Sequence, residues 1–214
     1  MMKLPSGWLK GGLFSVFSLI ALAVLSACAM NPAALTNSLS GALHNSQAKS
    51  NSFSFSLVPS PGIKACLPHA RGRVTITPED LNDEMDISVS GLAPNTGYDL
   101  FVIELPNKPF GVSWYQTDLQ TDKHGNGSVS VRGIFDVETF SISPGGPSTT
   151  FGTVHQYHLG LWFNDPKVPF KLGCEPGQPK PVVTPFNGEQ HAGIQVLNTS
   201  NFPDKAGPLS HVHR

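Results

Sequence analysis

Charged side chains are scarce in this chain of 214 residues. Lysine and arginine number 14 and aspartate and glutamate 15, so that only 14% of the residues carry a charge. Long exposed helices and coiled coils need many charged residues on their outer faces, and this composition argues against them. The near balance of the two signs gives no strong electrostatic field for nucleic acid. We therefore expect no nucleic-acid partner.

Recognisable catalytic and phosphate-binding motifs are also missing. The chain has no G-x-S-x-G segment, which positions the nucleophile in many hydrolases, and no glycine-rich phosphate loop. A carboxylate pair such as Asp118 and Glu138 can be chosen for glycoside cleavage, but the sequence gives no reason to prefer it. The sequence therefore favours a non-catalytic domain without a cofactor. A metal-dependent or hydrolytic enzyme stays open as an alternative.

No charged residue lies between Lys10 and Lys49. The stretch begins with an apolar run over 13–24 and continues into small residues, which is the order of parts in a secretory signal. The segment Leu25-Ser26-Ala27-Cys28 has an aliphatic residue, two small residues and a cysteine. This pattern resembles the lipobox of bacterial lipoproteins.

The resemblance implies that Cys28 is lipidated. In such lipoproteins the thiol receives a diacylglycerol, the preceding peptide bond is cut and the new N-terminus is acylated. Several acyl chains anchor a protein stably, because each buried methylene contributes roughly 0.8 kcal/mol. The implied organisation is a signal peptide over 1–27, a lipidated flexible tether over 28–51 and a domain over 52–214. The domain would be held at the cell membrane or the outer membrane, facing away from the cytoplasm.

Two other interpretations of the N-terminus stay open. The run 11–30 is just long enough to cross a bilayer as an uncleaved helix. Alternatively, it is an ordinary secretory signal in which the cysteine occurs by chance. Lys3 and Lys10 stay on the cytoplasmic side in each case, so all three interpretations place the domain outside the cytoplasm.

Cysteine is rare, with three residues in the chain. With Cys28 assigned to the lipid, Cys66 and Cys174 remain as an even pair in an oxidising compartment. We predict that they form a disulfide, which constrains the unfolded chain by about 4–5 kcal/mol for a loop of roughly 100 residues. Two free buried thiols are the alternative.

Short strand-like runs begin at residue 52. Polar and apolar residues alternate over 52–57 and 85–90, a period of two that is typical of a half-buried strand. Further runs rich in β-branched and aromatic residues cover 72–77, 98–105, 112–119, 127–135, 138–142, 155–163 and 192–197. Glycine- and proline-containing turns separate them. We expect an all-β domain, an immunoglobulin-like β-sandwich of about 7–10 strands.

One helical turn is expected between two of these strands. Thr77 is a good N-cap residue, and Pro78 follows it at the first helical position. The turn would continue through 79–85.

The segment Ser90–Val102, SGLAPNTGYDLFV, resembles the fibronectin type III pattern, in which leucine, proline, threonine and tyrosine recur at alternate positions. That family implies an immunoglobulin-like sandwich in which a tyrosine, here Tyr98, fixes a corner between strands. We carry over the sandwich class and not the strand order, because more of the chain follows this segment than in fibronectin domains. Three further stretches resemble exported bacterial proteins and imply no activity: WYQTDLQTD (114–122), LGLWFNDP (159–166) and TPFNGEQHAG (184–193).

Histidines are the weak candidates for a metal site. His155 and His158 fall on one expected strand, where residues three apart point to opposite faces, and His191 follows a glycine-containing loop. We therefore expect ordinary surface or core histidines here, with a metal site as the less favoured interpretation. The carboxylates at 79–86 suggest calcium, but they lack the spacing of a recognised calcium loop.

Aromatic residues suggest a binding surface. Trp114 and Tyr115 are adjacent on an expected strand, so one ring faces the core and the other faces outward or toward a second layer. An exposed ring can stack on a sugar or contact a partner protein. The sequence therefore predicts a membrane-anchored lipoprotein with a binding or envelope-associated domain, whose partner is an envelope protein or a glycan. A carbohydrate-binding module is the second alternative.

Overall fold

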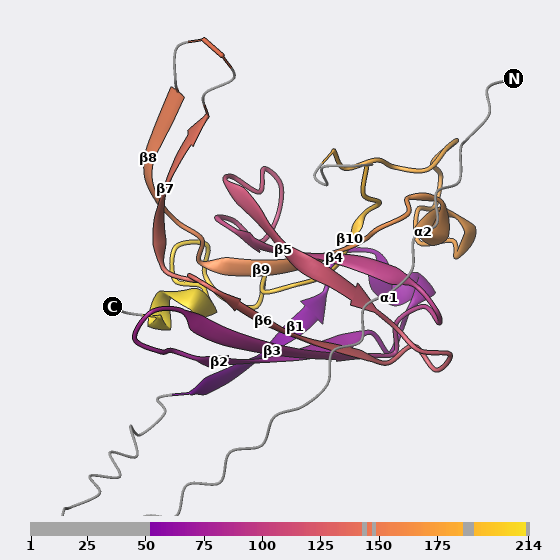
Figure 1. Ribbon diagram of the computed structural model, residues 1–214. Coiled ribbons are helices and arrows are strands. Elements are labelled where there is room, and N and C mark those ends of the chain that lie inside the picture. The colour runs from indigo at the N-terminus through magenta and orange to yellow at the C-terminus, as the bar shows by residue number, and fades with distance from the viewer. Residues whose placement is uncertain (1–51, 143–144, 147–148, 186–190, 213–214) are drawn as a thin grey trace, which may run out of the picture. The chain divides into compact units, whose positions relative to one another are not determined.

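The computed structural model describes residues 52–142, 145–146, 149–185 and 191–212 (Figure 1). The expected signal peptide and the tether, including Cys28, lie outside these residues. No helix in the described part of the chain has the length and apolar character needed to span a bilayer.

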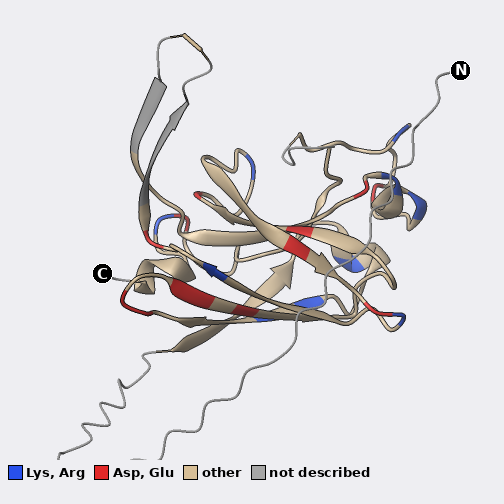
Figure 2. Cartoon of the chain, in the orientation of Figure 1, with Lys and Arg blue, Asp and Glu red and all other residues tan. Residues whose placement is uncertain are grey.

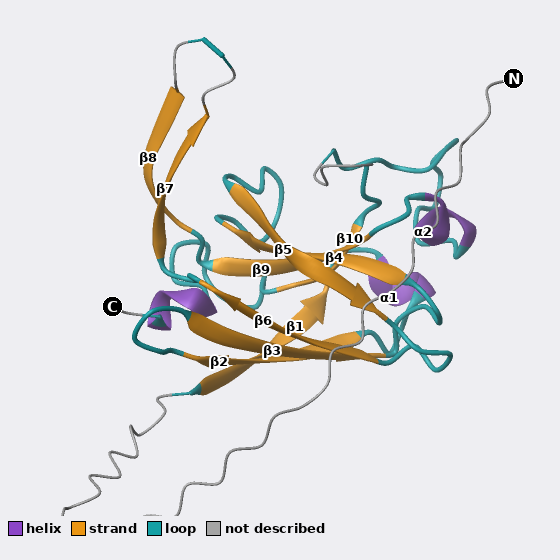
Figure 3. Cartoon of the chain, viewed as in Figure 1, coloured by secondary structure: helices purple, strands orange, loops and turns teal. Residues whose placement is uncertain are grey.

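The described residues are mostly β-strands joined by loops (Figure 3). The strands are β1 (Phe53–Pro59), β2 (Arg71–Thr77), β3 (Asp83–Ser90), β4 (Gly97–Ile103), β5 (Ser113–Gln120), β6 (Gly127–Gly133), β7 (Val137–Ile142), β8 (Thr149–His155), β9 (His158–Phe163) and β10 (Gln195–Asn198). The helices are short: α1 (Ile63–Cys66), α2 (Lys167–Lys171) and the 3-10 helix η1 (Pro208–His211). The prediction of an all-β domain of about 7–10 strands is confirmed.

Eight strands form one antiparallel sheet in the order β5-β4-β9-β10-β1-β2-β3-β6. β1 joins the two halves of this sheet, because Phe53–Leu57 pair with β2 whereas Val58 and Pro59 pair with β10. The halves face each other around a common core, as in a sandwich (Figure 1).

The end strands β5 and β6 come close together, which nearly closes the sheet into a barrel-like form. A Cβ atom on Gly127 would lie 2.7 Å from Leu119 Cδ2 and 2.8 Å from the carbonyl oxygen of Gln120. Only glycine allows β6 to approach β5 so closely. Near closure also protects strand edges that would otherwise be open to other chains.

The core follows the alternation seen in the sequence. Val74 and Ile76 of β2 and Met85 and Ile87 of β3 are fully or almost fully buried, while serine, threonine and charged residues alternate with them on the outer face. β9 differs, because every residue from His158 to Phe163 is buried. β9 is therefore an interior strand covered on both sides.

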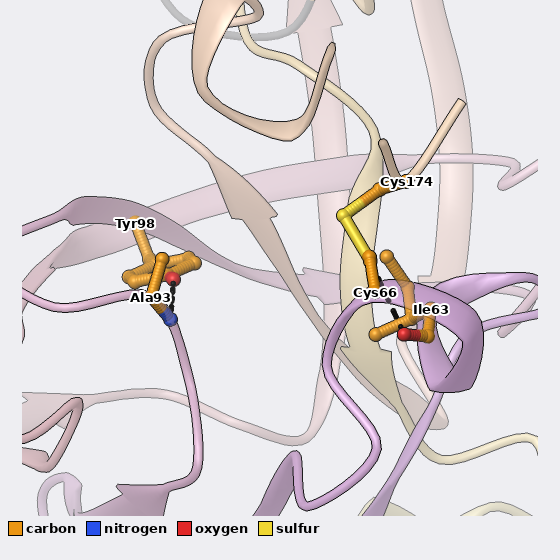
Figure 4. Close-up of a disulfide and its surroundings, with 5 residues drawn as sticks. All are labelled: Ile63, Cys66, Ala93, Tyr98 and Cys174. Carbon is orange, nitrogen blue, oxygen red and sulfur yellow. Dashed lines mark hydrogen bonds between the residues drawn. A yellow bond between two sulfur atoms is a disulfide. The ribbon is translucent and has the colours of Figure 1, made fainter. Parts of the chain in front are cut away.

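The disulfide prediction is confirmed. The Sγ atoms of Cys66 and Cys174 are bonded at 2.08 Å (Figure 4). The bond joins the end of α1 to the segment that follows α2, across a sequence separation of 108 residues.

Tyr98 is anchored at the start of β4. Its side chain is completely buried, and its hydroxyl oxygen accepts a hydrogen bond of 3.0 Å from the backbone N–H of Ala93 (Figure 4). The bond ties the start of β4 to the turn that precedes it.

The expected helical turn after Thr77 is wrong. β2 continues to Thr77, the chain bends at Asp80 and Leu81, and β3 begins at Asp83. Thr77 pairs with Glu84 across this short connection. Only five residues separate the two strands, so pairing of their ends leaves no room for a helical turn.

The expected strand over 155–163 is divided in the structure. His155 ends β8 and His158 begins β9, with Gln156 and Tyr157 between them. β8 pairs with β7 in a separate two-stranded sheet, which extends away from the eight-stranded sheet (Figure 1). We did not expect β8 as a strand of its own.

Candidate functional site

The three candidate histidines occupy different environments. His155 and His158 lie on two strands rather than one, and His191 is exposed next to Ala192, which forms an isolated bridge with Thr184. Among the described residues, no three His, Cys, Asp or Glu side chains gather closely enough to hold a metal ion.

His158 is part of the internal structure. Its Nε2 lies 3.0 Å from the carbonyl oxygen of Asp204, and its Nδ1 lies 2.8 Å from Thr199 Oγ1. Because a carbonyl oxygen only accepts, Nε2 carries the proton and Nδ1 accepts from the Thr199 hydroxyl. Burial lowers the pKa of His158 below its ordinary value, against the opposing effect of these hydrogen bonds and of the Asp204 charge. This neutral histidine holds the segment after β10 against β9.

His155 lines a small cavity of about 270 Å³. We call it the His155 pocket. Its lining comes from the two residues after β4, from β8 and the segment after it, and from the loop before η1: Glu104, Leu105, Thr153, Val154, His155, Tyr157, Asp204 and Lys205. The pocket thus gathers four ionisable side chains and one phenol from three separate parts of the chain.

The His155 ring is stacked on the Tyr157 ring. Their centroids lie 4.2 Å apart with an interplanar angle of 9°. The Nε2 atom of His155 is buried, and no hydrogen-bond partner reaches it within the part of the chain that the structure describes. A buried polar atom without a partner is unfavourable unless a ligand or water satisfies it.

Glu104 is held in place by the β4–β5 connection. Its carboxylate oxygen Oε2 accepts a hydrogen bond of 3.1 Å from the backbone N–H of Val112. Gly111 has a φ of +68°, and a Cβ there would lie 2.3 Å from Glu104 Oε2. This glycine therefore makes room for the carboxylate beside the backbone.

Trp114 and Tyr115 are both exposed, with 57% and 44% of their surface accessible. They point to different faces of β5: Trp114 pairs with Val102, which belongs to the main core, whereas Tyr115 pairs with Phe101 on the opposite face. Trp114 is thus on the core-side face of β5 and Tyr115 on the face of the second cluster, but neither ring is buried. The two rings also do not form one continuous platform.

Tyr115 is positioned by two contacts. Its ring meets Phe101 edge-on, with centroids 5.6 Å apart, and its hydroxyl donates a hydrogen bond of 2.9 Å to Asp118 Oδ1. An exposed aromatic ring beside a carboxylate offers a stacking face and a hydrogen-bond acceptor, which match the C–H faces and hydroxyl donors of a sugar.

A second apolar cluster lies behind Tyr115 on the outer face of β4 and β9. Trp162 is its centre, with Phe101 and Phe110 edge-on at centroid distances of 5.4 and 5.1 Å. Gly160 leaves space for the indole, because a Cβ there would lie 2.3 Å from Trp162 Cζ3. The apolar runs over 100–103 in β4 and 159–163 in β9 are the sequence signals for burial on both faces.

The acidic residues at 79–86 do not form a calcium site in the structure. Asp83 is buried and accepts a hydrogen bond of 3.1 Å from the backbone N–H of Phe135. Glu79 and Glu84 both form ion pairs with Arg132. The carboxylates are therefore spread along β3 and its approach, and no described group of three could hold a metal ion.

A second hollow of about 410 Å³ lies over the outer face of β2, β3 and β6. Its lining is Arg73, Thr75, Asp86, Ile87, Ser88, Ser128, Val129 and Ser130. Ser130 and Asp86 are hydrogen-bonded across the strands. Most of the side chains that line this hollow are short and polar. Figure 2 shows residues of both charge signs spread over several strands and loops.

The sequence indicated one of the residues that define the His155 pocket and missed the others. His155 was a candidate, whereas Glu104, Tyr157 and Asp204 were not. Glu104 and Asp204 are far from His155 along the chain, so no local pattern could have connected them with it. No protein-family model and no curated protein matches this chain.

Proposed function

We propose that the protein is a lipid-anchored extracytoplasmic lipoprotein with a non-catalytic binding domain. Residues 1–27 are the signal peptide, Cys28 carries the lipid, and 28–51 tether the domain to the cell membrane or the outer membrane. One observation supports this proposal most. Of the three cysteines, Cys66 and Cys174 are joined to each other, so Cys28 at the end of the apolar run is the remaining thiol.

The disulfide also supports the location. Disulfides form and persist in oxidising compartments outside the cytoplasm. A domain on a short tether has a high effective concentration toward any partner on the same surface, so even a weak binding site is useful there.

Lipidation is tested in a bacterial expression host by labelling with a fatty acid that can be detected after purification. We expect label and membrane fractionation for the wild-type chain and for a C66A/C174A variant, and loss of both for Cys28→Ser. Mass spectrometry of the wild type should show an acylated chain that begins at residue 28. Recovery of an unmodified chain that begins at Met1 from the cytosol contradicts the proposal.

A carbohydrate-binding module is the second candidate function. The exposure of Trp114 and Tyr115, and the hydrogen bond from Tyr115 to Asp118, favour it. Titration with a panel of envelope glycans should then change the tryptophan fluorescence, and Tyr115→Ala should weaken the response. Unchanged fluorescence throughout the panel counts against this candidate.

A hydrolytic or metal-dependent enzyme has less support. The His155 pocket does combine a histidine with two carboxylates, as such an enzyme requires. Its lining contains neither serine nor cysteine, and no described trio of side chains is placed to hold a metal ion. Elemental analysis that finds one metal ion per purified chain would favour the metal-dependent enzyme.

A further inference from the structure

Three large apolar side chains remain exposed at one end of the domain. Leu81 in the β2–β3 connection is 86% exposed, Trp114 in β5 is 57% exposed, and Ile134 directly after β6 is 49% exposed. A single exposed apolar residue is ordinary on a protein surface, whereas a gathered group marks a contact with a partner or a membrane.

The strand register brings these three positions to the same end. Leu81 lies shortly before the start of β3, and that start pairs with Gly133 at the end of β6, next to Ile134. A Cβ atom on Gly133 would lie 3.4 Å from Oε1 of Gln116, which follows Trp114 closely on β5. We call Leu81, Trp114 and Ile134 together the apolar end.

The chain also enters the domain at the apolar end. The first described residue, Ser52, has its Oγ 3.2 Å from Oγ1 of Thr77, the last residue of β2. Figure 1 shows the start of β1, the β2–β3 connection and the start of β7 on the same side of the domain. The proposed tether over 28–51 therefore joins the domain next to Leu81. A flexible chain of that length spans roughly 25–30 Å, so this attachment keeps the apolar end near the lipid.

The charges around Leu81 are not those that attract an anionic membrane. The β2–β3 connection contains Glu79 and Asp80 and no lysine or arginine, and the nearby Arg132 already forms ion pairs with Glu79 and Glu84. Contact with lipid at this end depends instead on the burial of apolar side chains, to which tryptophan adds its preference for the membrane–water interface. A zwitterionic lipid surface fits this chemistry better than an anionic one.

We propose that the apolar end docks on the lipid surface that holds the anchor. Leu81 and Ile134 insert at the boundary between headgroups and acyl chains, and Trp114 lies at the level of the headgroups. The inference rests on the proposed lipid anchor and adds a second membrane contact, which orients the domain. The opposite end, where β9 leads into α2, then faces away from the membrane.

Tryptophan fluorescence reports this docking. Trp8 belongs to the proposed signal peptide, which is cut off, and Trp162 is completely buried, so Trp114 is the exposed tryptophan of the mature chain. We would reconstitute the acylated protein in phosphatidylcholine vesicles with and without bromine on the acyl chains. Bromine should quench the emission, high salt should not reverse the quenching, and Trp114→Phe should abolish it. No quenching, or quenching that is lost in high salt, overturns the proposal.

Substitutions at the apolar end test the contact itself. The double variant L81S/I134S should reduce the quenching of Trp114 by about twofold or more, because less apolar surface is buried in the lipid. Leu81→Ser alone should act in the same direction, and it replaces a side chain that is almost fully exposed in the fold. Thermal unfolding checks that both variants are folded. Wild-type quenching in the folded variants overturns the proposal.

Leu172→Ser is the matched control. Leu172 is also exposed, at 41%, but it follows α2 at the opposite end of β9. This variant should be quenched as the wild type is, and a loss equal to that of Leu81→Ser would overturn the proposal. Mass spectrometry of the reconstituted protein separates two failures. A chain without acyl groups contradicts the anchor and the docking together, whereas an acylated chain without quenching contradicts only the docking.

Discussion

The Tyr98 hydroxyl oxygen accepts a hydrogen bond of 3.0 Å from the backbone N–H of Ala93, five residues earlier in the chain. Both residues are buried, so water cannot replace this bond. Burial raises the pKa of the Tyr98 phenol well above its usual range, which keeps the hydroxyl neutral. The contact fixes the chain direction at the entry to β4, the strand that carries Phe101 and leads into Glu104.

Replacing Tyr98 by phenylalanine should therefore destabilise the domain. The variant keeps the ring but leaves the N–H of Ala93 buried without a partner, which costs about 1–3 kcal/mol. Urea denaturation followed by far-UV circular dichroism measures the change. Tyr115→Phe is the matched control, because its hydroxyl bond is exposed and its loss should change stability by less than about 0.5 kcal/mol. Equal effects of the two substitutions would contradict the structural role of Tyr98.

The disulfide should make a large contribution to stability. Removing both cysteines as C66A/C174A should lower the free energy of unfolding by about 2–5 kcal/mol, because the unfolded chain loses a constraint. Denaturation curves of the variant and of the wild type with and without reductant give this value. Thiol labelling of the denatured wild type without reductant should find neither Cys66 nor Cys174 free; labelling of both would refute the bond.

Acidification should weaken the fold through His158. Its pKa is lower in the folded protein than in the unfolded chain, so the folded state binds fewer protons as the pH falls. The contribution is fully present above the ordinary histidine pKa of about 6.5 and is lost as the pH falls toward the lower folded pKa, with a slope of at most about 1.4 kcal/mol per pH unit.

This dependence is measured by unfolding wild type and His158→Gln at a series of pH values between 5 and 8. The variant should be less stable near neutral pH and should show a shallower dependence on pH. His191→Gln is the control, because that imidazole is exposed, and it should follow the wild type. Parallel curves for wild type and His158→Gln would show that another group causes the acid sensitivity.

Gly160 should tolerate no side chain. An alanine Cβ would lie 2.3 Å from Trp162 Cζ3 and 2.7 Å from Gln195 Nε2, so the indole must move. We expect Gly160→Ala to cost about 1–3 kcal/mol, as in other overpacked interiors, and to change the near-UV circular dichroism of tryptophan. Gly146→Ala, where no atom lies within 4 Å of the added Cβ, should do neither. A wild-type spectrum and stability for Gly160→Ala would contradict the packing of Trp162.

Local patterns were sufficient for much of the fold. The alternation of serine with phenylalanine and leucine in β1, and of apolar residues with aspartate and serine in β3, reports directly which side chains face the core. The same rule failed for the run 155–163, which is two strands, because the chain passes from one sheet to the other at Gln156 and Tyr157 without a glycine or proline to mark the break. It also gave no sign of β8, which pairs with β7.

The sequence by itself determined the all-β class and the pairing of Cys66 with Cys174. The alternation of polar and apolar residues marks the strands, and two cysteines in an oxidising compartment tend to pair. Only the tertiary structure decided that the sheet nearly closes, and that Glu104, His155 and Asp204 line one pocket. These residues come from three distant segments. Their meeting depends on the order of strands in space, which is set by packing of the whole core and by no local pattern.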